Sequence, residues 1–229
     1  MTPFPKALVF DLDGTLVDTA PDLTLVLNWL LAREGHPKVD ELAVRHMVGR
    51  GARHLILQGM SVGGDAPGED ELTRLTGDFI AHYGDHICER SVAFAGVVET
   101  LEDFRARGIT MGVCTNKPEG LSRQLLDALD LSQYFTALLG GDSLHVRKPD
   151  PLHLLKTIEV MGHAPHEAVM VGDSISDVRA ARDAGVAIVG VSFGYTDTPI
   201  AELDPDIVID RFADLPLALA RMLQGSASA

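Results

Sequence analysis

The chain has 229 residues, a length that suits one large domain or a core with a smaller insert. Hydrophobic residues make up 46% of it, which is enough for a packed core and excludes a largely disordered chain. The 33 acidic residues outnumber the 19 basic residues and give a net charge of −14, which argues against a protein that wraps nucleic acid.

Short apolar runs recur along the chain, and each of them ends in polar or small residues. Continuous runs of this kind are typical of strands that are buried on both faces, as in a parallel sheet, because a half-exposed strand would alternate apolar and polar residues. The predicted strands are residues 7–10, 110–114, 137–139, 168–171, 187–191 and 206–209.

Helical patterns lie between these strands. Residues 97–107 place apolar side chains on one face and end at Gly108, a residue suited to the position after a helix. Residues 118–129 begin with a proline and carry four leucines on one face, and the alanine-rich residues 176–184 stop at Gly185. Alternating strands and helices predict an α/β fold with a doubly wound parallel sheet, in which ligands bind at the carboxyl ends of the strands.

Residues 19–91 interrupt this alternation, because they show helical patterns and no clear strand. We expect them to form a helical insert between the first strand and the helix that follows it. The predicted helices of the insert are residues 21–33, 40–48, 52–58 and 69–86. The predicted domains are a core of residues 1–18 and 92–229 and a helical insert of residues 19–91.

Two carboxylates, Asp11 and Asp13, follow the first predicted strand with one residue between them. Two acids so close together at the tip of a buried strand are costly to hold as anions without a cation. Mg²⁺ is usually held by one or two carboxylates, several waters and a substrate phosphate. Asp173 follows another predicted strand and would reach the same end of the sheet, so Asp11 and Asp173 are candidate ligands of Mg²⁺.

A phosphate site is predicted at the same edge of the sheet. Thr115 and Asn116 follow a strand and precede a helix, so the Thr115 hydroxyl, the backbone N–H groups and the helix dipole would cradle a phosphate. Lys148 adds a fixed positive charge, which an anionic substrate needs in a chain with a net charge of −14. We therefore expect a small-molecule phosphate ester as the substrate and no nucleic acid.

The same residues resemble the four motifs of the haloacid dehalogenase-like (HAD) phosphatase superfamily, in the order in which that superfamily carries them. The matching segments are residues 11–17 (DLDGTLV), Thr115-Asn116, Lys148-Pro149 and residues 172–177 (GDSISD). The resemblance covers about residues 7–215. It implies a Rossmann-like HAD core, with the helical insert as the small α-helical cap of the family.

The resemblance implies separate roles for the first two aspartates. Asp11 would be the nucleophile that attacks phosphorus and forms an aspartyl-phosphate. Asp13 would protonate the leaving oxygen and later deprotonate the hydrolytic water. Dehalogenases of similar architecture lack this second aspartate, so its presence favours cleavage of a phosphate ester.

The resemblance also assigns binding roles to the later motifs. The implied phosphate ligands are Thr115, Asn116 and Lys148. The implied Mg²⁺ ligands are Asp11, the backbone carbonyl of Asp13, and Asp173. Asp177 would orient a metal-bound water or Lys148, and Ser174 would either contribute from the start of its helix or simply cap that helix.

A finer resemblance is to phosphoglycolate phosphatases, which hydrolyse 2-phosphoglycolate to glycolate and phosphate. It is carried by residues 18–23, 48–53 and 193–195. In the cap, Arg50 or Arg53 would recognise the substrate carboxylate, or both would merely solvate a helix start. Gly49 and Gly51 would let the cap backbone approach the ligand closely, or would form a plain turn.

Other functions remain open at this point. Related phosphatases with similar motifs act on sugar phosphates, N-acetylmuramic acid 6-phosphate or pyrophosphate. A β-phosphoglucomutase-like transferase would carry a cap histidine soon after the first motif, and residues 18–27 contain none. A signalling module phosphorylated on Asp11 would be about half this length and would lack both Asp13 and the cap.

The sequence carries no mark of secretion or of a membrane. The two cysteines, Cys88 and Cys114, form no disulfide framework. The residues before the first strand are too few for a signal peptide, and no apolar stretch approaches the ~20 residues of a membrane helix. We expect a cytoplasmic protein without membrane contact, present as a monomer or a homodimer.

Overall fold

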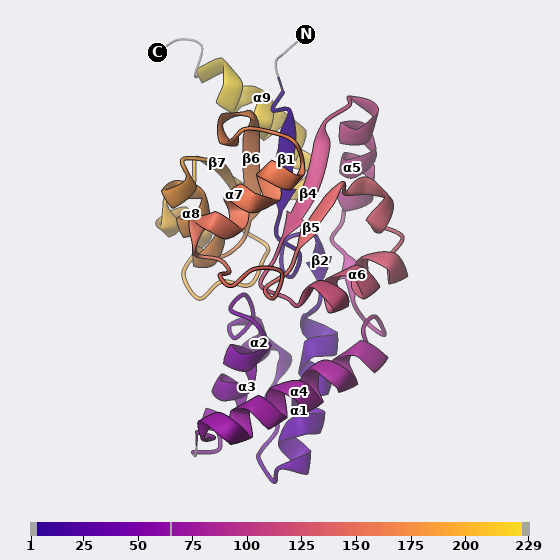
Figure 1. Ribbon diagram of the computed structural model, residues 1–229, viewed down its shortest axis with the longest axis vertical. Helices are drawn as coiled ribbons and strands as arrows, with labels where there is room; N and C mark the ends of the chain where they lie inside the picture. Colours follow the sequence, from indigo (N-terminus) through magenta and orange to yellow (C-terminus); the bar gives the residue numbers. More distant parts are fainter. Residues whose placement is uncertain (1–3, 65, 226–229) are drawn as a thin grey trace.

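The computed structural model describes residues 4–64 and 66–225, and its main sheet has six parallel strands in the order β5-β4-β1-β6-β7-β8 (Figure 1). These strands are β1 (Ala7–Phe10), β4 (Thr110–Cys114), β5 (Ala137–Leu139), β6 (Ala168–Gly172), β7 (Ala187–Val191) and β8 (Ile207–Ile209). The chain builds outward from β1 through β4 to β5, then returns to the other side of β1 with β6. This reversal makes the sheet doubly wound, as predicted.

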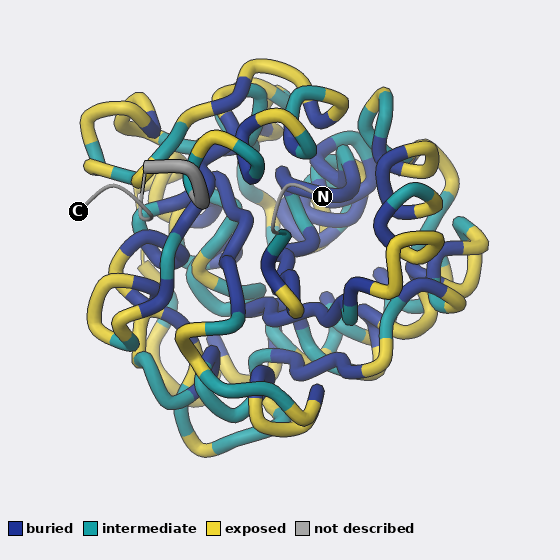
Figure 2. Tube along the Cα trace, turned by 90° about the horizontal axis from the view of Figure 1, so that it is seen from above, coloured by how far each residue is buried: buried dark blue, intermediate teal, exposed yellow. Residues whose placement is uncertain are grey.

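Helices cover both faces of the sheet because successive side chains of each strand point to opposite sides. Leu8 and Phe10 of β1 belong to an apolar cluster with α5, α6 and α9, whereas Ala7 and Val9 belong to a second cluster with α7 and α8. The helices are α5 (Val97–Ala106), α6 (Glu119–Ala128), α7 (Pro151–Val160), α8 (Ile175–Ala184) and α9 (Leu215–Gly225). All four residues of β1 are fully buried, and Figure 2 shows the buried chain gathered in the interior.

Four helices form a separate layer beyond the carboxyl ends of the strands (Figure 1). They are α1 (Ala20–Arg33), α2 (Glu41–Arg45), α3 (Ala52–Ser61) and α4 (Glu69–Asp85). Their buried apolar faces build a third cluster, which includes Leu27, Leu30, Ile56 and Phe79. We call this four-helix segment the cap. The predicted limits of the cap as a domain stay a prediction.

Two adjacent connections join the cap to the core. The short strand β2 (Val17–Asp18) pairs with the antiparallel β3 (Val92–Ala93), so the chain leaves and re-enters the core side by side. The buried Asp22 carboxylate of α1 accepts hydrogen bonds from the backbone N–H groups of Arg90 and Ser91, the latter at 2.8 Å. The start of the cap is thereby fixed to its end.

Helix limits in the cap differ slightly from the predictions. The predicted helix over residues 40–48 ends at Arg45, because the chain must turn into Gly49, whose φ of +98° lies in the left-handed region. The helix predicted over residues 52–58 continues to Ser61. No helix within residues 4–64 and 66–225 is long and apolar enough to cross a membrane. Short 3₁₀ helices lie at Ser132–Tyr134, Pro165–Glu167, Ile200–Leu203 and Phe212–Asp214.

Candidate active site

The strand ladders place three of the predicted residues at one edge of the sheet. Asp11 follows β1, and its backbone N–H donates to the carbonyl oxygen of Val171 at 2.9 Å. Thr115 follows β4, and its N–H donates to the carbonyl oxygen of Leu139 at 3.1 Å. Asp173 follows β6. All three side chains are buried at the switch point of the strand order, where α/β sheets of this kind bind ligands.

Lys148 lies between two aspartates at the centre of this edge. Its Nζ is 2.9 Å from Asp11 Oδ1 and 2.6 Å from Asp177 Oδ1, and its side chain is 0% exposed. Burial lowers the pKa of Lys148, but the attraction of Asp11 and Asp177 outweighs burial and holds that pKa above its usual range. The lysine is therefore a permanent positive charge beside the Asp11 carboxylate.

Asp11, Asp173 and Asp177 form a buried carboxylate cluster, in which one oxygen of each lies within 4.8 Å of the others. Burial, together with repulsion from Asp177 and Asp13, raises the pKa of Asp11 to about 7 despite the opposing effect of Lys148. Burial and then Asp11 and Asp177 raise the pKa of Asp173. Carboxylate oxygens crowded in this way fit a hard divalent cation such as Mg²⁺, whose charge offsets their repulsion.

Asp173 is held in place by its surroundings. Thr15 Oγ1 donates to its Oδ1 at 2.8 Å, and the backbone N–H of Tyr195 donates to its Oδ2 at 2.7 Å. Two glycines leave room for the carboxylate. A Cβ at Gly194 would lie 2.2 Å from Asp173 Cβ, and a Cβ at Gly14, whose φ is +83°, would lie 2.5 Å from Asp173 Oδ2.

Asp177 uses both of its carboxylate oxygens. Oδ2 accepts from the backbone N–H and the hydroxyl of Ser174 at 3.0 and 2.7 Å, while Oδ1 faces Lys148. Ser174 is the residue before the first turn of α8, so this pair closes the start of that helix. Ser174 therefore caps α8, and Asp177 contacts both Ser174 and Lys148; the role predicted for Asp177 stays a prediction.

Asn116 connects the core to the cap. Its Nδ2 donates to the carbonyl oxygen of Lys148 at 3.0 Å and to that of Gly49 at 2.9 Å. Both amide hydrogens are therefore engaged, so Asn116 can offer a phosphate only its backbone N–H. Gly49 and Gly51, both with positive φ, line the space between cap and core next to Asn116.

The Asp13 carboxylate is not part of the carboxylate cluster. Its Oδ1 lies 3.0 Å from Nζ of Lys117, a residue for which the sequence predicted no role. The same Nζ donates to the hydroxyl of Tyr83 in α4 at 2.9 Å. Lys117 directly follows Thr115-Asn116 at a strand tip, and this position is the feature of the sequence that could have identified it as a site residue.

A small cavity of about 40 Å³ lies between these residues and the cap. The core supplies Asp11, Asp13, Thr115, Asn116, Lys117, Pro118 and Leu121, and the cap supplies Leu23, Val48, Gly49, Gly51, Ala52, Leu55, Phe79 and Tyr83. Polar groups of the core thus face a mostly apolar surface of the cap.

A family of known proteins matches most of the chain. Residues 8–191 match the model described as haloacid dehalogenase-like hydrolase. The chain belongs to the haloacid dehalogenase-like hydrolases. It is therefore an enzyme of this superfamily, as the four motifs predicted.

Similar proteins agree in length as well as in sequence. A phosphoglycolate phosphatase of Agrobacterium fabrum is 44% identical over 229 residues, which cover 99% of this chain and 98% of the relative. One of Caulobacter vibrioides is 45% identical over 216 residues, with coverage of 94% and 91%. The crystal structure of a predicted phosphoglycolate phosphatase from Haemophilus somnus has a TM-score of 0.87 and 36% identity, with coverage of 93% and 97%. The predicted HAD fold and the similarity to this phosphatase group are confirmed.

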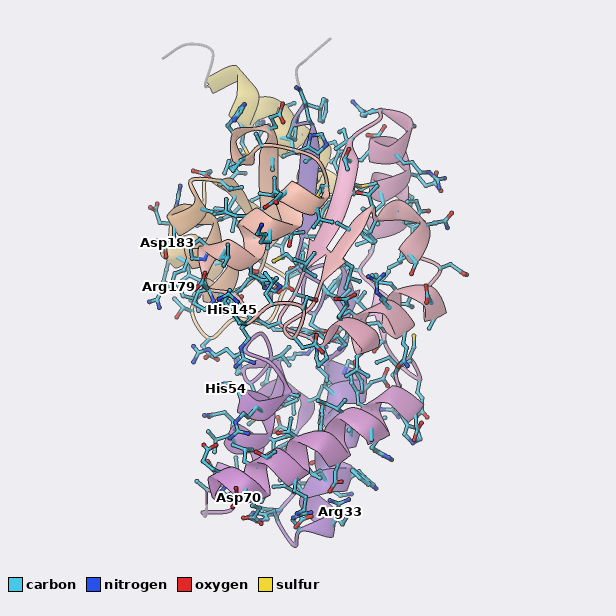
Figure 3. The ribbon with its side chains drawn as sticks, viewed as in Figure 1. Arg33, His54, Asp70, His145, Arg179 and Asp183 are labelled. Atoms are coloured by element: carbon cyan, nitrogen blue, oxygen red, sulfur yellow. The ribbon has the colours of Figure 1, made fainter. Side chains whose placement is uncertain are left out.

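The two arginines predicted for the cap of this HAD enzyme lie outside the cavity lining. Arg53 points to the surface, where it pairs with Glu69. Arg50 lines a neighbouring cleft at the cap–core boundary together with His54, Arg147 and Arg179. Figure 3 shows His54 of the cap and Arg179 of α8 on opposite sides of that boundary, both towards the left of the view.

Proposed function

We propose that this HAD enzyme is a Mg²⁺-dependent phosphomonoesterase that hydrolyses 2-phosphoglycolate to glycolate and phosphate. The observation that carries the proposal is the Asp11 carboxylate at the β1 tip, 2.9 Å from the buried Lys148 and beside the carboxylates of Asp173 and Asp177. Relatives named phosphoglycolate phosphatase, 44% and 45% identical, support this choice of substrate.

Asp11 is the proposed nucleophile. Lys148 reduces the negative potential at Asp11, so that an anionic phosphate can approach an anionic carboxylate. One Asp11 oxygen attacks phosphorus as the bond to the leaving oxygen breaks, which gives an aspartyl-phosphate. The hydroxyl of Thr115 and the backbone N–H of Asn116 supply donors for the equatorial oxygens of the phosphoryl group, because the backbone N–H of Lys117 already donates to Thr115 Oγ1.

Asp13 is the proposed acid and base. It protonates the leaving oxygen of glycolate in the first step and removes a proton from the attacking water in the second. Asp13 lines the cavity together with Lys117, to which it is hydrogen-bonded at 3.0 Å.

Two of the residues proposed to hold the metal, Asp11 and Asp173, belong to the carboxylate cluster. Asp11, the backbone carbonyl of Asp13 and Asp173 would hold Mg²⁺, with the fixed Asp177 carboxylate beside them. The chemistry that such an ion supplies when bound is charge neutralisation and polarisation of a phosphate oxygen. Asp177 also keeps Lys148 in position.

A substrate panel tests the proposal. We would measure kcat/KM with Mg²⁺ for 2-phosphoglycolate, a hexose 6-phosphate, N-acetylmuramic acid 6-phosphate and pyrophosphate, and repeat each assay with EDTA. The highest value is expected for 2-phosphoglycolate, with loss of activity in EDTA. A different substrate in first place would refute phosphoglycolate, and the absence of multiple turnovers on every ester would refute the phosphatase and favour a slow phospho-aspartate module.

A further inference from the structure

The cavity offers a charged ligand very few partners. Its cap side consists of glycines, aliphatic side chains and the rings of Phe79 and Tyr83. Its core side carries the carboxylates of Asp11 and Asp13. Among the described residues that line this cavity, Lys117 is the only one with a cationic side chain. A negative group beyond the phosphate of a bound ester would therefore have one cation within the cavity.

Lys117 is buried, with a side-chain exposure of 4%, and it still has capacity for a ligand. An ammonium group has three donors. Asp13 and Tyr83 accept two of them, at 3.0 and 2.9 Å. Among the described residues no acceptor for the third donor is found, and Lys117 is part of the cavity lining.

The contact with Asp13 places Lys117 near the position that the carboxylate of a bound substrate would take. The proposed acid must reach the leaving oxygen of the ester. In 2-phosphoglycolate the carboxyl carbon is separated from that oxygen by a single methylene group. A residue in hydrogen-bond contact with Asp13 therefore lies near the carboxylate of a substrate whose leaving oxygen faces Asp13.

Tyr83 holds Lys117 from the cap side. Burial raises the pKa of Tyr83 to about 12, so its hydroxyl stays protonated at neutral pH and accepts from the ammonium group. Lys117 Nζ also lies 4.3 Å from the centre of the Tyr83 ring, a cation–π distance. The lysine thus comes from the core but takes its position from α4 of the cap.

We propose that Lys117, positioned by Tyr83, recognises the carboxylate of the substrate and selects esters that carry an acid next to the phosphate. This inference rests on the proposed phosphatase function. It gives Lys117 the role that the sequence suggested for Arg50 or Arg53, neither of which lines the cavity. The selected substrate class is a short phosphate ester with a carboxylate two bonds from the leaving oxygen.

Two esters that differ only in this carboxylate test the proposal. We would compare 2-phosphoglycolate with 2-hydroxyethyl phosphate, in which CH₂OH replaces the carboxylate, on the wild type and on Lys117→Met. Loss of a charge-assisted hydrogen bond is expected to reduce kcat/KM for 2-phosphoglycolate by roughly 10- to 100-fold more than for 2-hydroxyethyl phosphate. The control is Lys156→Met, which removes a lysine from an exposed pair with Glu159 and should change neither value.

Tyr83→Phe provides a second, nearly isosteric variant in case Lys117→Met folds poorly. It keeps the charge of Lys117 and the ring beside it but removes the hydroxyl that holds Nζ. The preference for 2-phosphoglycolate over 2-hydroxyethyl phosphate should fall about 3- to 10-fold.

Equal losses on both esters in the two variants would overturn the recognition role and leave Lys117 as a residue that only positions Asp13. A wild type that hydrolyses neither ester would instead refute the proposed function, so the two failures are distinguishable.

Discussion

The core and the cap hold their parts of the site by different means. In the core, strand ladders place Asp11 and Asp173, and both carboxylates have further fixed polar partners. The cap presents a mostly apolar wall. Its link to the catalytic loops includes the bonds from Asn116 to Gly49 and from Lys117 to Tyr83. From this difference we infer that the proposed chemistry depends on the sheet, whereas the proposed choice of ester depends on a few contacts between cap and core.

The largest effect is expected at Asp11. Asp11→Asn removes the proposed nucleophile but keeps the shape of the side chain, so kcat should fall by about 10⁴-fold or more on every phosphate ester. Steady-state phosphate release measures this loss. Asp103→Asn, at an exposed partner of Arg107, is the matched control and should retain activity. Turnover at the wild-type rate in Asp11→Asn would contradict the idea that the core alone carries the chemistry.

The next effect concerns stability and compares a buried ion pair of the core with a surface ion pair that has the same N–O distance. Lys148 and Asp177 are 2.6 Å apart with both side chains fully buried, and Lys6 and Glu167 are also 2.6 Å apart but partly exposed. Lys148→Met leaves buried carboxylates uncompensated, so the free energy of unfolding without Mg²⁺ should fall by about 3–5 kcal/mol.

Lys6→Met should cost about 0–1 kcal/mol in the same measurement, because an exposed ion pair adds little to stability. Urea unfolding at one pH and one salt concentration compares the two variants. Similar values for both would show that burial does not distinguish the catalytic edge from the surface.

A smaller effect tests whether burial and the charge of Lys148 influence a histidine behind the site. Burial and then repulsion from Lys148 lower the pKa of His153, on α7, from 6.5 to about 4. The neutral ring therefore contributes stability that is fully present above pH 6.5 and is lost as the pH falls towards 4. His153→Leu should flatten the dependence of unfolding free energy on pH in this window, by at most about 1.4 kcal/mol per pH unit.

Urea unfolding across that pH window measures the slope, with His166→Leu at an exposed position as the control. An unchanged slope in His153→Leu would mean that another group accounts for the acid sensitivity.

The smallest effect separates the two cap arginines. Arg50 lines a cleft with Arg147 and Arg179, so Arg50→Ala should weaken the local positive field and lower kcat/KM for an anionic ester about 2- to 10-fold at low salt. The loss should shrink at high salt because of screening. Arg53 pairs with Glu69 at the surface, so Arg53→Ala should stay within about twofold of the wild type. A larger loss for Arg53 than for Arg50 would restore Arg53 as a substrate residue.

The sequence was sufficient to predict the edge of the sheet where the site lies. Apolar runs mark strands buried on both faces, and parallel strands end at one edge, so Asp11, Thr115 and Asp173 had to converge. The helix α7 was not predicted, although its start carries two ordinary signals. Asp150 accepts a hydrogen bond from the backbone N–H of Leu152, and Pro151 occupies the first turn.

Side-chain partners were harder to predict because they depend on packing between distant segments. Lys117 bonds to Tyr83, 34 residues away, and to Asp13, 104 residues away. The acidic cluster brings Asp177 together with Asp11 and Asp173, whereas the sequence suggested that Asp177 orients a metal-bound water or Lys148. The roles proposed for these residues, the cytoplasmic location and the monomer or homodimer state stay predictions. Residues 1–3 and 226–229 of the predicted core and residue 65 of the predicted insert lie outside the described residues.

The two-stranded ribbon of β2 and β3 has a consequence for how this protein could change over evolution. Val17 pairs with Ala93, so the whole cap begins and ends at one hydrogen-bonded point. The cost of closing a loop rises only slowly with its length. A longer, shorter or unrelated segment could therefore be grafted at this point with little disturbance of the sheet. The ribbon is thus a site at which one cap can be replaced by another during evolution, so that the same reaction could act on new substrates.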